Sequence, residues 1–180
     1  MKHDPNRPHR RTIRLRGWDY RSPGLYFVTI CAFERQNLFQ HQDFREIAVQ
    51  ALARIPTQEH ARHVAMDESV VMPNHVHVIF EFTDYPAQAI GLAPTGQLGN
   101  AVRGSLGVVV GRYKTAVTTR INKLRQRTGL PVWQRGYYER IIRDEGELRS
   151  IRRYIQENPL RWAEDRDNLD GLLARMTYRP

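Results

Sequence analysis

This chain has 180 residues, enough for one compact domain, and its 28 Lys and Arg against 19 Asp and Glu give a formal net charge of +9. That basic excess favours a polyanionic partner such as nucleic acid. No run approaches the roughly 18 apolar residues of a membrane span, and the first residues do not resemble a secretory signal. The single cysteine, Cys31, excludes an intramolecular disulfide. We therefore expect a cytoplasmic, nucleoid-associated protein with no membrane contact.

The first 23 residues are rich in Arg, His and Pro and show little apolar periodicity. We predict that residues 1–23 form a loosely ordered basic arm that clamps a phosphate backbone, with a solvated tail as the alternative. An apolar run of aromatic and β-branched residues follows the turn signal at 22–24 and predicts a first strand over 25–33.

Residues 43–99 are predicted to form a helix, a β-hairpin and a loop, in that order. Apolar residues recur at helical spacing from Phe44 to Ile55, which predicts a helix capped by Asp43. Extended segments over 62–72 and 76–82, joined by a proline and an asparagine, predict a hairpin. The Pro- and Gly-containing residues 83–99 predict a loop, with a short helical turn over 87–90.

The second half of the chain completes the pattern. Apolar residues from Leu106 to Leu124 follow one stripe of a long helix. Residues 132–143 predict a strand bent near Gly136, and residues 145–158 predict a last helix. The order predicts an α+β fold of the ferredoxin-like split β-α-β type, an antiparallel sheet with two helices on one face. We expect this domain to span 24–163, followed by a tail over 164–180.

The pair His75 and His77 is the most informative chemical feature. Residues i and i+2 of a strand point to the same face, so the two imidazoles project side by side and can share one divalent ion. Two packed or exposed histidines with no ligand are the alternative. Since one chain offers no second thiolate, the remaining ligands must be oxygen atoms.

The last predicted helix carries Tyr154 and Asn158, which are spaced i, i+4 and share one face. If that face lies over the histidine strand, a phenol and an amide oxygen both approach the ion. The alternative is that Tyr154 only packs in the core and Asn158 only ends the helix. A phenol is a poor nucleophile unless a cation or base favours the phenolate. A metal ion also polarises a phosphoryl oxygen, so the set suits phosphodiester transesterification.

Three segments carry a family resemblance: residues 72–79 (Met-Pro-Asn-His-Val-His-Val-Ile), 132–143, and 154–159 (Tyr-Ile-Gln-Glu-Asn-Pro). In this order and spacing they resemble the REP-associated tyrosine transposases, relatives of the single-strand insertion-sequence transposases, over about residues 12–163. The resemblance implies an HUH fold, a Mg²⁺ or Mn²⁺ ion on His75 and His77, and Tyr154 as the nucleophile that forms a 5′-phosphotyrosine.

The resemblance also implies Asn158 as the third protein ligand, at a place where the related insertion-sequence enzymes usually have glutamine. It implies a metal-dependent endonuclease and strand transferase that recognises single-stranded DNA with hairpin or palindromic elements and cuts at or near them. A catalytically silent hairpin-binding protein and an HUH replication initiator or relaxase are the alternatives. Monomer and homodimer both stay open.

The other tyrosines compete for the nucleophile role. Tyr113 falls on the helical core stripe, while Tyr137 and Tyr138 alternate on a strand, so we expect one in the core and the other as a base-stacking platform. Trp133 is expected to pack rather than to stack on a base. The residues that we expect to contact DNA are Arg11, Arg14, Arg16, Arg112, Lys114, Arg120, Lys123, Arg135, Tyr138 and Arg140.

Overall fold

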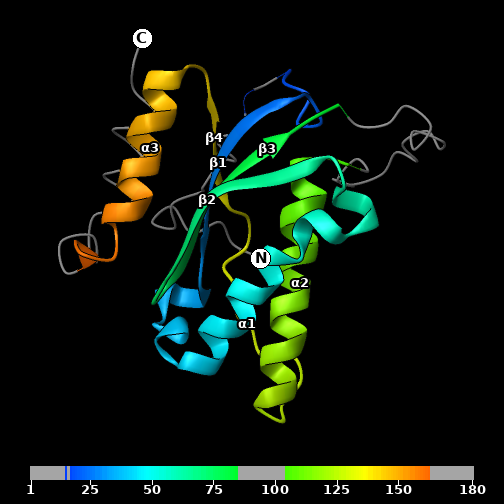
Figure 1. Cartoon of the computed structure of the whole chain (residues 1–180). Coiled ribbons are helices and arrows are strands. Elements are labelled where there is room, and N and C mark those ends of the chain that lie inside the picture. Colours follow the sequence, from blue (N-terminus) through cyan, green and yellow to red (C-terminus); the bar gives the residue numbers. More distant parts are fainter. Residues whose placement is uncertain (1–14, 16, 85–103, 163–180) are drawn as a thin grey trace, which may run out of the picture.

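The computed structural model describes residues 15, 17–84 and 104–162 (Figure 1). Its centre is a four-stranded sheet in the order β2-β3-β1-β4, in which every neighbouring pair is antiparallel. A split β-α-β pattern gives this order, because each helical connection skips one strand position. The predicted fold class is therefore confirmed. The strands are β1 (Gly24–Cys31), β2 (Val64–Met72), β3 (His75–Phe82) and β4 (Tyr138–Ile142).

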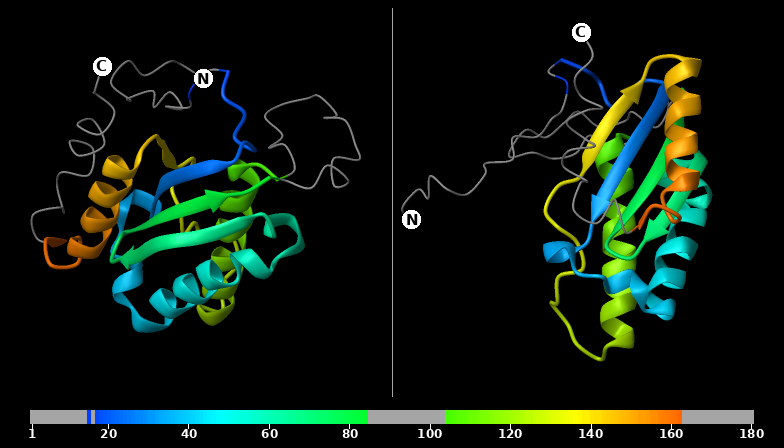
Figure 2. Two further views of the ribbon diagram at one scale, coloured as in Figure 1. Left: turned by 45° about the horizontal axis from the view of Figure 1, so that its top comes forward. Right: turned by 90° about the vertical axis from the view of Figure 1, so that its left-hand side faces the viewer.

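Helices cover both faces of this sheet. The two helices predicted for one face, α1 (Gln42–Ala53) and α2 (Leu106–Leu124), lie together there, and α3 (Glu145–Glu157) lies on the opposite side of the sheet (Figures 1 and 2). Because successive strand residues point to opposite faces, β1 and β3 can be apolar at nearly every position and fill two cores. Short 3-10 turns complete the fold: η1 (Phe33–Arg35), η2 (Leu38–Gln40), η3 (Ile55–Thr57) and η4 (Glu59–Ala61).

The smaller core holds α3 on the sheet. Phe27 and Ile79 of the two central strands pack there with Leu148, Ile151 and Ile155 of α3, all of them nearly inaccessible to solvent. The N terminus of α3 is capped by Asp144, whose carboxylate accepts a hydrogen bond from the backbone N–H of Glu147 at 2.8 Å. Apolar burial and the cap together set where the last helix lies.

Replacing Ile151 with alanine is expected to lower the free energy of unfolding by about 2–5 kcal/mol, because it removes a fully buried side chain between α3 and the sheet. Urea denaturation of the whole chain measures this loss. The matched control is Arg153→Ala, an exposed position two residues along the same helix. Equal stability of the two variants would contradict the packing of α3 on this face.

Two sequence predictions about these elements need correction. Helix α1 begins at Gln42 with His41 as its N-cap, so Asp43 lies in the first turn, where its charge favours the helix dipole, instead of capping. The strand predicted over 132–143 is regular only in β4; the earlier part joins the sheet through a single bridge between Ala32 and Trp133. Gly136, with φ of +79°, turns the chain between these two parts.

The end of the predicted arm belongs to the folded body. The indole N–H of Trp18 donates to the hydroxyl of Tyr26 at 3.2 Å, and that hydroxyl donates to the carbonyl of Ser22 at 2.7 Å. The carbonyl of Tyr20 accepts from the backbone N–H of Leu106 at 3.0 Å. Residues 1–14 and 16 of the arm, the helical turn predicted over 87–90 and the tail over 164–180 lie outside the described residues. No described helix is long and apolar enough to cross a bilayer.

Candidate active site

The two histidines of β3 point toward α3. Val76 and Val78 alternate with them and pack in the larger core against α1 and α2, whereas His75 and His77 share the face of Ile79. Their side chains are buried, with residue exposures of 1% and 0%. The strand alternation predicted from the sequence therefore brings the two imidazoles together, with ring centroids 4.4 Å apart.

Neighbouring groups orient each ring. The amide oxygen of Asn74 lies 2.7 Å from Nδ1 of His75, and the hydroxyl of Thr29 lies 2.8 Å from Nδ1 of His77. Thr29 reaches that position because it is paired with His77 across β1 and β3. When Nδ1 of each ring carries the proton, Nε2 of each keeps a lone pair, and the two Nε2 atoms lie 3.0 Å apart.

Burial keeps both imidazoles uncharged. It lowers the pKa of His75 to about 4, with a smaller contribution from the nearby guanidinium of Arg35. Burial also lowers the pKa of His77 well below its usual value, and the neighbouring His75 adds to that shift. Two neutral rings whose lone pairs face one small volume form a nitrogen-donor pair suited to a cation.

Tyr154 of α3 reaches this pair. Its hydroxyl lies 3.1 Å from Nε2 of His77, and its ring packs edge-on against Phe27 with a centroid separation of 6.3 Å. The phenol is half-buried, so it is open to a partner from solvent. The sequence left open whether the face shared by Tyr154 and Asn158 lies over the histidine strand, and for Tyr154 the structure meets that condition.

Asn158 lies one turn beyond Tyr154. It is 1% exposed, and within the described part of the chain neither its amide oxygen nor its amide nitrogen has a hydrogen-bond partner. One further turn along, the ring of Trp162 lies 6.0 Å from that of His75. Asn158 therefore sits between two side chains that contact the two histidines. A buried amide without partners costs free energy, and a ligand at the site would satisfy it.

Polar pairs fix α3 against β2. Arg152 donates two hydrogen bonds to the carboxylate of Asp67, at 2.8 and 2.5 Å, and Gln156 donates to Glu68 at 2.7 Å. The two acidic residues stand at an irregularity of the β2–β3 register between Met66 and Ser69. Because this bulge presents consecutive carboxylates, both pairs can form on one side of α3. They keep the helix that carries Tyr154 on the histidine face.

The candidate donors at this site are Nε2 of His75 and Nε2 of His77, and the buried amide oxygen of Asn158 lies on the same helix as Tyr154, one turn beyond it. Among the residues that the structure describes, no group of three His, Cys, Asp or Glu side chains gathers in a way that could hold a metal ion. His75, His77 and Asn158 are the described residues that could hold one here. Sequence reasoning gave no role at the site to Thr29, Asn74 or Trp162. Asn74 lies in the quoted segment 72–79, directly before His75, so a signal for it was present. Thr29 is placed only by strand register, and Trp162 only by the path of the chain after α3.

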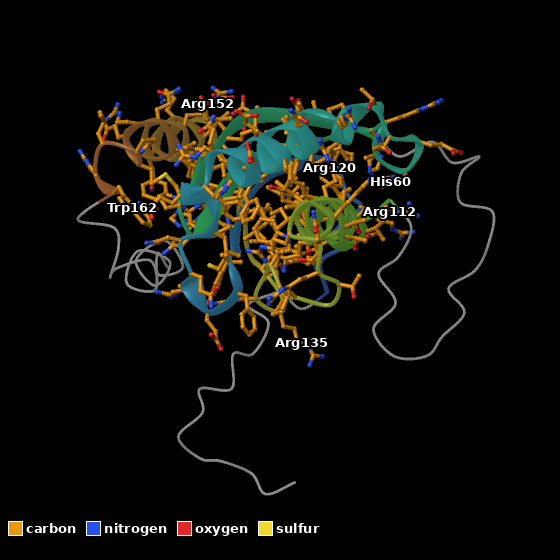
Figure 3. All side chains as sticks on the ribbon, turned by 90° about the horizontal axis from the view of Figure 1, so that it is seen from below. His60, Arg112, Arg120, Arg135, Arg152 and Trp162 are labelled. Carbon is orange, nitrogen blue, oxygen red and sulfur yellow. The ribbon has the colours of Figure 1, made fainter. Side chains whose placement is uncertain are left out.

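The predicted DNA-contacting residues divide between the two sides of the molecule. Arg112 and Arg120 lie on the side of α1 and α2, away from Arg152 and Trp162, which were not among the predicted contacts and mark the side of α3 (Figure 3). Tyr138, paired with Thr29, is on the α3 side. Lys123 is also on α2 and is exposed, as is Arg135 in the segment before β4. Arg11, Arg14 and Arg16 lie outside the described residues.

Two of the predicted contacts have structural roles inside the chain. Lys114 donates to the carbonyls of Gln134 and Gly136 and so holds the segment that leads into β4. Burial lowers the pKa of Lys114 to about 8. Arg140 forms an ion pair with Glu147 at the start of α3. Their DNA contacts stay predictions.

The aromatic predictions can be compared residue by residue. Tyr113 is 2% exposed and belongs to the larger core, where Trp133 also packs, as expected for both. Tyr137 packs against the same core. Tyr138 is half-buried and paired with Thr29 on the face of the histidines, the alternation predicted for two consecutive strand residues. Only Tyr138 and Tyr154 of these tyrosines lie near the imidazole pair.

Comparison with known proteins finds one relative by sequence and a solved structure of similar fold. No family model matches the chain. A Haemophilus influenzae protein described as uncharacterized is 37% identical, in an alignment that covers 90% of this chain and 94% of that protein. A solved REP-associated tyrosine transposase bound to a REP hairpin is similar in fold, with a TM-score of 0.53 and 19% identity over 80% of this chain and 71% of that chain. The fold is therefore transposase-like.

Proposed function

The chain belongs to the same family as the Haemophilus influenzae protein, and we propose that it is a metal-dependent HUH endonuclease and strand transferase that cuts single-stranded DNA at or near hairpins. The transposase-like fold and the net charge of +9 support a DNA substrate. The observation that carries the proposal is the hydroxyl of Tyr154 at 3.1 Å from Nε2 of His77, whose own distance to Nε2 of His75 is 3.0 Å.

The residues at the site fit a Mg²⁺ or Mn²⁺ ion. Two ligands about 2.1 Å from an octahedral ion and at right angles to each other are about 3.0 Å apart, and the two Nε2 atoms are separated by 3.0 Å. Asn158 would supply the third ligand through its unpartnered amide oxygen. When bound, the ion would polarise a phosphoryl oxygen and favour the phenolate form of Tyr154. Because all three ligands are neutral, none of them cancels its charge.

The proposed reaction exchanges one phosphodiester for another. The phenolate oxygen of Tyr154 attacks phosphorus, and a bond forms between them while the bond from phosphorus to the 3′ oxygen breaks. The 3′ oxygen takes up a proton and leaves as a hydroxyl, and the 5′ phosphate stays on the tyrosine. Attack by a 3′-hydroxyl on this phosphotyrosine runs the same step backward and rejoins a strand. Phe27 packs edge-on against the phenol ring.

The DNA would approach on the open side of the histidine face. Tyr138 stands beside Thr29 on that face and would stack on a base near the cut. The arm residues Arg11, Arg14 and Arg16 would add phosphate contacts, as would Arg135. Arg112, Arg120 and Lys123 would bind a part of the substrate that is not at the reacting phosphate.

A covalent-complex assay tests the proposal. The full chain is incubated with hairpin DNA that has a single-stranded extension and a label on the 5′ side or the 3′ side of the cut, with or without Mg²⁺ or Mn²⁺. We expect a complex that survives denaturation, requires the metal, and carries the label of the fragment with the 5′ phosphate. A catalytically silent hairpin-binding protein would bind the same DNA without forming this covalent complex. That outcome would exclude the proposed endonuclease activity.

Replacing Asn158 with alanine is expected to raise the Mg²⁺ concentration that gives half-maximal cleavage, because one ligand is lost. The free energy of unfolding without metal is expected to stay within about 1 kcal/mol of wild type, since the amide has no described partner to lose. Metal titrations and urea denaturation measure the two effects. Asn122→Ala is the matched control, because that buried amide donates to the carbonyl of Leu130 at 2.9 Å. If the Asn158 variant has a lower free energy of unfolding but needs the same Mg²⁺ concentration for half-maximal cleavage, Asn158 has a packing role and is not a metal ligand.

A further inference from the structure

Trp162 stands beside the histidine pair, and the proposed cleavage gives it no role. Its ring lies 6.0 Å from that of His75, centroid to centroid, with an angle of 37° between the two planes. It is four positions beyond Asn158 and eight beyond Tyr154. Because positions four apart on a helical path share one side, these three side chains follow one another along the histidine face.

The chain between Asn158 and Trp162 has a defined path. The backbone N–H of Arg161 donates to the carbonyl of Glu157 at 3.2 Å and to that of Asn158 at 3.1 Å. The guanidinium of Arg161 also forms an ion pair with the carboxylate of Glu157 at 2.9 Å. These contacts continue the helical turn past Pro159 and bring Trp162 back to the ring of His75.

Trp162 keeps part of its surface open to solvent. It is half-buried, and Figure 3 shows it at the outer edge of the folded body, on the side of α3. Tyr113 and Trp133, at 2% and 9% exposure, are instead closed within the larger core. An indole that contacts the metal-binding pair and is also open to solvent offers the flat aromatic surface on which a base stacks.

Trp162 and Tyr138 occupy different places at the site. Tyr138 is paired with Thr29, and Thr29 is paired with His77, so that tyrosine belongs to the strand row of His77. Trp162 contacts His75, two residues away on the same face of β3. The two rings are therefore not alternatives for one position of the substrate.

We propose that Trp162 stacks on the base of a nucleotide that adjoins the cut and so fixes the strand at the reacting phosphate. The inference rests on the proposed function, which brings that phosphate to an ion on His75 and His77. Only one sugar separates a base from its phosphate, so a phosphate at the imidazoles leaves a base within reach of Trp162. Stacking tolerates any base, but a base inside a stem is covered by its neighbours, so this contact selects an unpaired nucleotide.

Abasic DNA tests the contact, because it removes one base and keeps every phosphate. The substrates are hairpin DNAs with a single-stranded extension in which one nucleotide at a time lacks its base. Fluorescence anisotropy with Mg²⁺ measures the affinity of the full chain for each of them, in a Tyr154→Phe parent that cannot cut. Trp162→Ala removes the indole and Trp162→Phe keeps a smaller ring. Leu160→Ala is the matched control, since this side chain of the same segment is 88% exposed.

At one position beside the cut, loss of the base should weaken binding by the parent about tenfold, the size of one stacked base. Trp162→Ala should bind the intact DNA about tenfold more weakly and lose nothing further at that position, because ring and base contribute only together. Trp162→Phe should keep part of both effects. Leu160→Ala should match the parent at every position.

Two outcomes would overturn the inference. One is a Trp162→Ala chain that loses as much affinity as the parent at every abasic position, because the indole would then only pack against His75. The other is a parent that loses no affinity at any of these positions. The covalent complex of the wild-type chain is a separate readout: its absence would remove the proposed cleavage, while the abasic series would still report whether ring and base meet.

Discussion

The variant Tyr154→Phe is expected to lose the covalent complex with DNA, with a fall in cleavage rate of at least about 10⁴-fold, because phenylalanine has no atom that can bond to phosphorus. Hairpin binding should stay close to wild type. The ring still packs against Phe27 and the helix keeps its contacts with the sheet, so the change removes one oxygen from an otherwise intact site. The labelled-hairpin assay measures the complex, and anisotropy measures binding.

The control for this variant is the other tyrosine on the same face. Tyr138→Phe removes the hydroxyl of a half-buried ring beside Thr29 and should keep the covalent complex. A complex that persists in Tyr154→Phe and disappears in Tyr138→Phe would move the nucleophile to β4. A covalent complex that persists in both variants would require a nucleophile other than Tyr154 and Tyr138, and it would contradict the proposed reaction.

Much of the fold follows from local pattern. The apolar runs of β1 and β3 and the helical stripe of α2 are strong signals, because each is set by burial of one continuous segment. The segment before β4 was harder to predict, since Val132 and Trp133 read as a strand by composition and Gly136 only as a bend within it. Its regular pairing begins only at Tyr138, because the chain turns at Gly136 and Lys114 binds the carbonyls on either side of that turn.

The residues of the candidate active site also divide into those that a local sequence pattern predicts and those that only the tertiary fold brings together. The i, i+2 and i, i+4 spacings are local, so they predicted the side-by-side imidazoles and the common face of Tyr154 and Asn158. Thr29 is 48 residues from His77 and meets it only through strand register, which no local pattern fixes. Trp162 follows a proline after the last helix, so its return to His75 depends on the path of the chain beyond the periodic segment.

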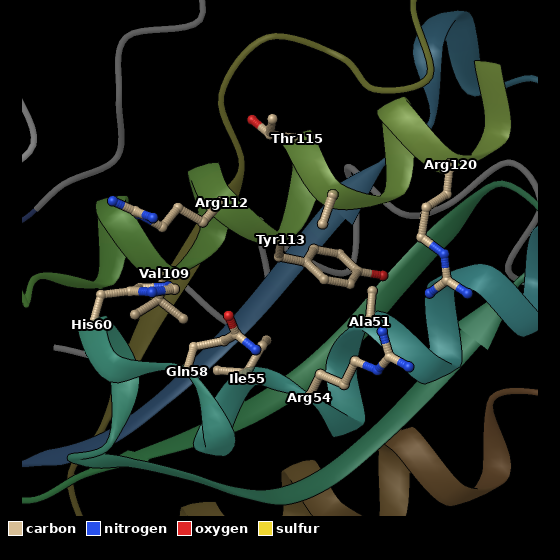
Figure 4. A pocket seen from close by; sticks show the side chains of 11 residues that line it. Ala51, Arg54, Ile55, Gln58, His60, Val109, Arg112, Tyr113, Thr115 and Arg120 are labelled. Carbon is tan, nitrogen blue, oxygen red and sulfur yellow. The ribbon is translucent and has the colours of Figure 1, made fainter. Parts of the chain in front are cut away.

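Basic residues were the least predictable part. The sequence places Arg112 and Arg120 outside the apolar stripe of α2, but it does not say which face of the sheet that helix covers. The structure puts them on the face opposite to Tyr154, where both line a pocket between α1 and α2 (Figure 4). Arg140 reads as a free cation and instead pairs with Glu147, because β4 runs directly into the cap of α3.

Replacing His75 with alanine should reduce Mg²⁺- or Mn²⁺-dependent cleavage by about 10³-fold or more, the equivalent of several kcal/mol of charge stabilisation at phosphorus. The reason is geometric: with one Nε2 gone, the remaining imidazole and Asn158 cannot hold the ion where the Tyr154 hydroxyl meets a phosphate. Because His75 is buried, the variant also loses packing, so cleavage must be compared at a temperature where both proteins are folded.

His63→Ala is the matched control for this change. His63 is also buried, at 4% exposure, and its Nε2 lies 2.8 Å from the carbonyl of Gly104, away from the candidate active site. Its loss should cost stability without changing the metal dependence of cleavage. Mn²⁺ binding to the Tyr154→Phe chain, with and without His75→Ala, separates the ligand from the nucleophile, since this measurement needs no chemistry. Equal Mn²⁺ affinity in the two proteins would mean that the paired imidazoles are packed side chains, and the phenol beside them would then lack the cation that makes it a nucleophile.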